Sequence, residues 1–251
     1  MVNLKKLKEQ YEKMNSTGGD FYEKFFQMGD GEASVRFLPW DRDDREFYAE
    51  SAIHRIDGKN YHCPGVENKE CPLCKTYRSI WEKINRIGKD TAEGKRLQQV
   101  ARGIKANSRF YLNAVDRRDG KVKILSAGKK LFSKILSIFI DEDYGDLTDL
   151  KSGWDFKIVR EQVAGFPNYD KSAPRPKQTP AGSDAEIATW MEELHDIHSL
   201  IKIADYEELS LISKEIMSVV SGGSSGLEDS SDNDQEDDSD DYLKKLNSLD
   251  S

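Results

Sequence analysis

The sequence predicts an α+β protein in which a small antiparallel β-barrel is interrupted and followed by helices. Three observations indicate this fold: short stretches of alternating apolar and polar residues, helical segments between and after them, and one cluster that holds every cysteine. With 251 residues the chain is long enough to bury a substantial core.

Alternation of apolar and polar residues predicts the strands. In the strand predicted at residues 108–115 only every other side chain faces outward, so we expect either Phe110 or Tyr111 to be buried. Asp119 and Gly120 then form a hairpin turn. Short strands with hairpin signals, interrupted by helices, are typical of a barrel of the oligonucleotide-binding type. The alternating stretches are residues 32–40, 108–115 and 154–163.

Apolar residues at helical spacing predict the helices. Ser183 provides an oxygen that can cap the helix beginning at Asp184. His195 and His198 lie on this acidic segment, where we expect them to be ordinary surface residues. The predicted helices are residues 4–14, 75–86, 129–140, 184–197 and 206–220.

Charge divides the chain into three parts. Residues 1–182 contain 34 Lys and Arg against 27 Asp and Glu, residues 183–227 contain 2 against 9, and residues 228–251 contain 2 against 10. A basic body with an acidic tail suggests a polyanion-binding surface with a like-charged competitor, although a solvated surface with a solubilising tail gives the same charges. We therefore divide the chain into a basic arm, residues 1–20, a core, residues 21–220, and a flexible linker with an acidic tail, residues 221–251.

The composition argues against a secreted or membrane protein. The first ten residues, MVNLKKLKEQ, carry charges where a secretory signal has an apolar run. No apolar run approaches the roughly 20 residues that cross a bilayer. Three cysteines in one tight cluster favour a reducing cytoplasm over a disulfide framework.

The cysteine cluster predicts a structural zinc site. Cys71 and Cys74 form a CxxC knuckle, Cys63 lies eight residues upstream, and His54 lies nine residues before Cys63. Three thiolates and one imidazole make a closed tetrahedral site for one Zn²⁺, with no position left for a catalytic water. His62 is the alternative fourth ligand; we favour His54 because adjacent residues rarely both reach one metal ion.

The sequence provides no positive signature of an enzyme. A thioredoxin-like pair would not need Cys63, and zinc deaminases have a glutamate two residues after the histidine, where Ile56 stands here. The SAGKK segment around Gly128 lacks the residues of a phosphate-binding loop. We therefore expect a binding protein.

Aromatic residues beside cations predict contacts with single-stranded nucleic acid, because bases stack on rings while Lys and Arg meet phosphates. Core packing is the alternative for many rings, and we expect Trp81 to be in the core. Phe166 and Tyr169 lie on a Gly/Pro/Asn loop, an unusual place for two rings that only pack. The predicted contact residues are Arg102, Lys105, Arg109, Phe110, Tyr111, Lys129, Lys130, Phe166 and Tyr169.

The segments ASVRFLP, GKKLFSKI and VAGFPNYD, together with the His/Cys cluster, resemble the helix-destabilising single-stranded-DNA-binding proteins of T-even-type bacteriophages. The resemblance runs with gaps from about residue 30 to 170. It implies zinc ligation by His54, Cys63, Cys71 and Cys74, and DNA-cleft aromatics at Phe110, Tyr111, Phe166 and Tyr169.

The resemblance also implies a fold and partners. The fold is of the oligonucleotide-binding type with a zinc subdomain and a basic cleft between them. The chain would associate head to tail with other copies along DNA through the arm, residues 1–20. The acidic tail would recruit phage replication and recombination proteins. We therefore predict a zinc-stabilised protein that binds single-stranded DNA independently of sequence in the host cell cytoplasm, during replication, recombination and repair. An RNA-binding protein and a zinc-stabilised protein-interaction adaptor are the alternatives.

Overall fold

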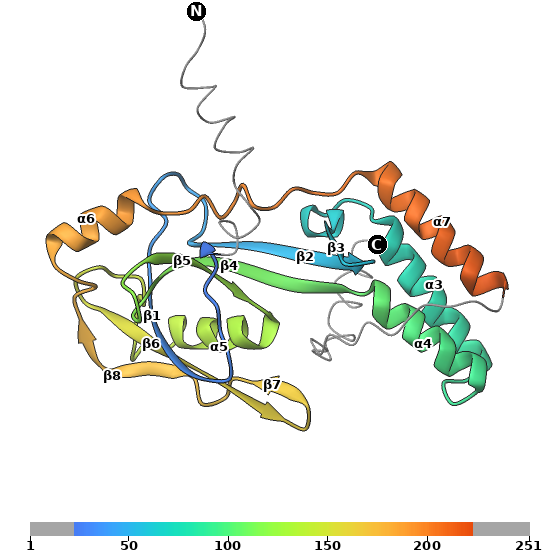
Figure 1. The fold of residues 1–251 in the computed structure, drawn as a ribbon, viewed down its shortest axis with the longest axis horizontal. Helices are drawn as coiled ribbons and strands as arrows, with labels where there is room; N and C mark the ends of the chain where they lie inside the picture. The colour runs from blue at the N-terminus through green and yellow to red at the C-terminus, as the bar shows by residue number, and fades with distance from the viewer. Residues whose placement is uncertain (1–22, 223–251) are drawn as a thin grey trace, which may run out of the picture. The chain divides into compact units, whose positions relative to one another are not determined.

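The structure is a computed structural model that describes residues 23–222 (Figure 1). The predicted helix at residues 4–14, the basic arm and the acidic tail lie outside these described residues. The chain divides into two compact units. The described part of the first comprises residues 23–48 and 111–197, and that of the second comprises residues 49–110 and 198–222.

The sheet of the first unit is antiparallel in every strand pair whose register is known. β1 lies between β4 and β6, with Val35 opposite Asp116 on one side and opposite Phe156 on the other. β5 pairs with β4, while β7 and β8 both pair with β6. The predicted α+β class and three predicted strand regions are therefore confirmed. The strands are β1 (Gly31–Phe37), β4 (Ala106–Asp116), β5 (Val122–Ala127), β6 (Gly153–Val163), β7 (Phe166–Asn168) and β8 (Ala173–Thr179).

The predicted hairpin turn joins β4 to β5. Gly120 has φ +71°, a left-handed conformation that glycine adopts without steric cost. Its backbone N–H donates to the Asp116 carbonyl at 2.8 Å, and the Asp116 N–H donates to the Lys121 carbonyl at 2.9 Å. These bonds close the turn at the position that Asp119 and Gly120 indicate.

Strand β4 departs from the predicted alternation. All seven residues from Phe110 to Asp116 are buried, with exposed fractions of 8% for Phe110 and 7% for Tyr111. The expectation that one of these two rings faces outward is wrong. A strand covered on both faces buries consecutive side chains, whereas alternation assumes that one face meets solvent.

Two helices of the first unit lie within the described residues. α5 (Lys129–Phe139) packs against the sheet, where the rings of Phe37 and Phe139 lie 6.4 Å apart. α6 (Asp184–Glu192) begins with the predicted cap, since the Ser183 hydroxyl accepts from the Glu186 N–H and the Glu186 carboxylate accepts from the Ser183 N–H.

α6 ends five residues earlier than predicted because Asn113 replaces the helical hydrogen bonds. The His195 N–H donates to the Asn113 side-chain oxygen at 3.1 Å, and the Asn113 amide donates to the His195 carbonyl at 2.9 Å. The His195 ring is half-buried and its Nε2 lies 3.1 Å from the Val122 carbonyl oxygen. The prediction of His195 as an ordinary surface residue on a helix is therefore wrong.

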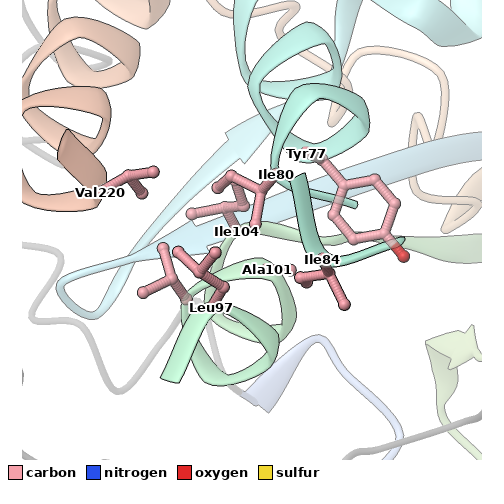
Figure 2. Packing of buried hydrophobic residues seen from close by; sticks show 8 residues of the cluster. Tyr77, Ile80, Ile84, Leu97, Ala101, Ile104 and Val220 are labelled. Carbon is pink, nitrogen blue, oxygen red and sulfur yellow. The ribbon is translucent and has the colours of Figure 1, made fainter. Parts of the chain in front are cut away.

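In its described part, the second unit combines a hairpin with three helices. Asp57 and Gly58, with φ of 49° and 74°, form the tight turn of the hairpin. Figure 2 shows the cluster in which Ile80 and Ile84 of α3, Leu97 of α4 and Val220 of α7 pack together. Trp81, predicted as a core residue, is half-buried against this cluster. The elements are β2 (Tyr48–Ile56), β3 (Lys59–His62), the 3-10 turn η1 (Pro64–Glu67), α3 (Pro72–Ile87), α4 (Ala92–Ile104) and α7 (Tyr206–Gly222).

None of the helices among residues 23–222 has the length and apolar character needed to span a bilayer.

Candidate functional site

Four elements of the second unit bring the predicted metal ligands together. His54 lies on β2, and Cys63 follows β3 and caps η1 by accepting from the Gly65 N–H at 3.3 Å. Cys71 is the N-cap of α3, and Cys74 lies in its first turn. Pro72 occupies the first helical position, where a missing N–H costs nothing. The helix therefore begins between the two thiols and turns both of them to the same side.

The ligand atoms form a compact, fully buried cluster. His54 Nε2 lies 3.3 Å from the Cys71 sulfur and 3.6 Å from the Cys74 sulfur, and the Cys63 and Cys74 sulfurs are 3.5 Å apart. All four ligand atoms lie within 4.8 Å of one another. A tetrahedral zinc ion with metal–sulfur bonds of about 2.3 Å holds its ligand atoms about 3.5 to 3.8 Å apart. The observed spacing therefore fits an ion at the centre of the cluster.

Hydrogen bonds distinguish the two histidines that are candidates for the fourth ligand. His54 Nδ1 lies 2.7 Å from the backbone carbonyl oxygen of Ile104, which can only accept, so Nδ1 carries the proton and Nε2 is left for a metal. His62 Nδ1 lies 2.6 Å from the Ser51 hydroxyl, and this half-buried ring is not part of the cluster. The geometry agrees with the choice of His54 over His62.

The electrostatics of the cluster favour a bound cation. Hydrogen bonds from Cys71 and Cys74 lower the pKa of the Cys63 thiol, so a thiolate forms readily. Burial opposes a charged His54, but the hydrogen bonds and charges of Cys63 and Cys71 outweigh it and raise the pKa of His54 to about 10. Hydrogen bonds with Cys63 and Cys71 raise the pKa of the Cys74 thiol, so the cluster does not ionise fully by itself. A divalent metal ion favours the thiolate form of its ligands and leaves the imidazole neutral.

The donor set therefore fits a structural metal centre. Three sulfurs and one nitrogen occupy all four positions around a tetrahedral ion, which is the arrangement of closed, non-catalytic sites. Such an ion would tie the β2–β3 hairpin to the N-terminus of α3. The hydrogen bond from His54 to Ile104 extends this connection to the end of α4. No sequence signal indicates that second connection, because it depends on the backbone of a distant helix.

In the second unit, the predicted DNA contacts cluster around the junction of α4 and β4. Arg102 is exposed near the end of α4, and Lys105 follows as its half-buried C-cap residue. Arg109 is half-buried on β4 and donates to the Ser108 carbonyl at 3.2 Å. Phe110, next to it, is buried. These three cations are therefore near one another in the sequence, and the aromatic ring beside them is mostly covered.

In the first unit, two predicted cations begin α5 and one predicted ring is buried. Lys129 and Lys130 occupy the first turn of α5, half-buried and exposed respectively. The Tyr111 ring packs edge-on against Phe25, with ring centroids 6.4 Å apart. A DNA contact by Phe110 or Tyr111 stays a prediction that requires the covered ring to become accessible.

The β6–β7 hairpin presents apolar side chains at its tip. Ala164 and Gly165 have φ of 52° and 84°, which makes the turn a tight one with two left-handed residues. Val163 and Phe166 flank this turn with exposed fractions of 53% and 43%. Tyr169 follows β7 and is half-buried. An exposed ring beside a tight turn is well suited to stack on a planar ligand such as a base.

Comparisons with known proteins agree with the resemblance found in the sequence. A family model described as gp32 DNA binding protein like matches residues 29–220. The single-stranded DNA-binding protein of Enterobacteria phage T2 is 27% identical over 230 residues, covering 82% of this chain and 72% of the phage protein. That of Enterobacteria phage T4 is 27% identical over 231 residues, covering 82% and 73%. The predicted resemblance is confirmed, and so is the prediction of a binding protein rather than an enzyme.

Proposed function

Because the chain belongs to the gp32-like family of DNA-binding proteins, we propose that it binds single-stranded DNA without sequence preference. The match of the family model to residues 29–220 carries this proposal. The matched region includes the His/Cys cluster and the exposed hairpin tip at Phe166. The names of the two phage relatives support the same ligand.

Each unit contacts DNA through its own residues. In the first unit Phe166 stacks on a base, since its ring is exposed and the tight turn holds it in place. Lys129 and Lys130 neutralise phosphates at the start of α5. In the second unit Arg102 and Lys105 do the same at the end of α4. The antiparallel sheet that supports Phe166 belongs to a barrel of the oligonucleotide-binding type.

One zinc ion stabilises the second unit by binding His54, Cys63, Cys71 and Cys74. The buried three-sulfur, one-nitrogen donor set supports zinc, which prefers tetrahedral sites of this composition. The chemistry that the ion supplies is structural: it holds the β2–β3 hairpin against α3. Through Ile104 it also fixes the segment that leads into Lys105 and Arg109.

Two segments outside the described residues regulate binding. The acidic tail, residues 228–251, competes with DNA for cationic surface and recruits replication and recombination proteins when displaced; its 10 acidic residues against 2 basic ones support this role. The basic arm, residues 1–20, binds a neighbouring copy and makes binding cooperative. The protein acts in the host cell cytoplasm during phage DNA replication, recombination and repair.

A competition experiment tests the ligand class. A labelled oligonucleotide of deoxythymidine is bound to the full-length, metal-loaded protein, and unlabelled single-stranded DNA, matched RNA and duplex DNA are added separately. We expect single-stranded DNA to displace the label at the lowest concentration. Displacement by RNA at a lower concentration than by DNA would assign the protein to RNA, since stacking alone does not distinguish the two sugars. Absence of binding to every nucleic acid would favour the protein-interaction adaptor.

A further inference from the structure

Strand β8 carries a bulge that displaces two cations from the edge of the first unit's sheet. In this stretch β6 contributes one residue, Asp155, while β8 contributes the three residues 175–177. Such a bulge leaves residues out of the ladder and redirects their side chains. Residues 175–177 are all exposed, as are Gln178 and Thr179 after them. On either side of the bulge, Phe156 lies opposite Pro174 and Trp154 lies opposite Gln178.

The acidic residue that faces the bulge is already engaged by other cations. The Asp155 carboxylate accepts from the Arg117 guanidinium at 2.6 Å and pairs with the buried Arg36 at 3.5 Å. Two guanidiniums therefore neutralise this single carboxylate. It has little charge left to balance a further cation on β8.

The two cations of the bulge have no acidic partner among residues 23–222. Arg175 donates to the Ser34 hydroxyl at 2.6 Å, and neither Arg175 nor Lys177 lies within ion-pair distance of a carboxylate there. Other lysines of the same sheet region are paired: Lys157 with Glu32 at 3.1 Å and Lys171 with Glu161 at 2.7 Å. The bulge is thus a place where positive charge is exposed and unbalanced.

Two prolines prevent this edge from binding another strand. Pro174 and Pro176 lack the N–H that a neighbouring strand would need, and proline is a common means of protecting an edge strand. Main-chain pairing with a protein partner is therefore disfavoured. What remains is an exposed pair of cations on an edge strand, which suits the phosphates of a polyanion.

We propose that Arg175 and Lys177 contact phosphates of the same DNA strand whose bases meet Phe166, an inference that rests on the proposed function. β7 and β8 both pair with β6, so the hairpin tip and the bulge lie along one strand. Asp155 beside the bulge and Val163 beside Phe166 are eight residues apart, or about 26 Å at roughly 3.3 Å per residue. Stacked nucleotides rise about 3.4 Å each, so a DNA strand that follows β6 from the hairpin tip to the bulge would span about eight nucleotides.

The test compares the full-length double variant R175Q/K177Q with the wild type and with a control, K121Q/K214Q. The control removes two positive charges from exposed lysines elsewhere, one at the β4–β5 turn and one on α7. Affinity for an oligonucleotide of deoxythymidine is measured by fluorescence anisotropy at several salt concentrations. Each phosphate contact contributes about 0.7 to the slope of log affinity against log salt for a single strand.

We expect R175Q/K177Q to bind more weakly at low salt, with a slope shallower by about 1.4. The control should keep the wild-type slope, and both variants should keep the wild-type Tm because the substituted side chains are exposed. A slope and affinity equal to those of the control would overturn the inference while leaving the proposed function intact. Tighter DNA binding by R175Q/K177Q would overturn it as well, and would indicate that these cations bind the acidic tail instead of DNA. A wild type that fails to bind DNA would instead refute the proposed function.

Discussion

His54 donates a hydrogen bond of 2.7 Å from Nδ1 to the backbone carbonyl of Ile104, the last residue of α4. The bond fixes the tautomer of the ring and directs Nε2 to the sulfurs of Cys71 and Cys74. A metal at the cluster therefore holds β2 in place relative to the end of α4. Residues immediately after Ile104 begin β4, so the metal and the proposed DNA contacts of this unit share one support.

Replacing the two histidines separately tests the ligand set. We expect His54→Ala to lose bound zinc on dialysis, because it removes one of four buried ligands. His62→Ala should keep one zinc per chain and lose about 1 to 3 kcal/mol of stability, because it removes the hydrogen-bond partner of the buried Ser51 hydroxyl. Metal analysis of the two dialysed variants shows which histidine is the zinc ligand. Zinc that stays in H54A and leaves H62A would reverse the assignment.

Removing the metal from the wild type should destabilise the second unit. Structural zinc contributes directly to folding, and three thiols around an empty centre repel one another once ionised. A loss of about 3 kcal/mol lowers the Tm of a unit of this size by roughly 12 °C or more. Calorimetry of chelated and metal-restored protein measures the shift. Equal melting curves before and after chelation would show that the cluster does not need an ion.

The exposed ring at the hairpin tip should contribute stacking energy. We expect Phe166→Ala to weaken binding of single-stranded DNA by about 1 to 3 kcal/mol with an unchanged salt slope, because stacking involves no counterion release. Leu211→Ala is the matched control, an exposed apolar residue on α7 whose loss should leave affinity unchanged. Anisotropy titrations at several salt concentrations provide both quantities. Equal affinities of F166A and L211A would exclude stacking at this position.

A buried carboxylate at the end of β4 gives stability a defined pH dependence. Burial opposes the charge of Asp116, but hydrogen bonds from Arg118 and Lys123 outweigh it and lower its pKa from 3.8 to about 2. A lowered pKa means that the stabilisation is complete above pH 4 and disappears as the pH falls through about 2. We expect Asp116→Asn to cost about 2 kcal/mol at neutral pH. Urea unfolding at pH 7, 5 and 3 should show the difference from wild type shrinking below pH 4, and a constant difference would contradict this origin.

Deleting residues 228–251 should tighten binding of single-stranded DNA at low salt. The segment contains 10 acidic residues against 2 basic ones, so its removal eliminates a competitor for cationic surface. Salt screens this competition, and the two proteins should converge as salt rises. A full-length variant with the acidic residues replaced by Asn and Gln separates charge from length. Unchanged or weaker affinity of the deletion would exclude competition by the tail.

The metal ligands could be predicted from the sequence because three of them depend on local spacing. Cys71 and Cys74 lie one helical turn apart, and Cys63 follows the hairpin that also contains His54. The sequence favours His54 over His62 because His62 adjoins Cys63, but the contacts that distinguish the two rings, His62 with Ser51 and His54 with Ile104, become visible only in the structure.

Other features could not be predicted because tertiary contacts determine them. α4 was not predicted, although its apolar residues have helical spacing, because Gly94 and Gly103 lower the helix propensity of its sequence. Phe110 and Tyr111 are both buried because β4 is covered on both faces. The unpaired cations at 175–177 become recognisable only when the bulge and the engaged Asp155 are seen.

The central claim is that this protein binds single-stranded DNA by stacking and phosphate contacts. The most direct measurement follows the intrinsic tryptophan and tyrosine fluorescence of the metal-loaded protein during titration with unstructured single-stranded DNA at low and moderate salt. We predict quenching that saturates and that requires more DNA as salt increases. No change in fluorescence at either salt concentration, from protein shown to contain its metal, would contradict the account.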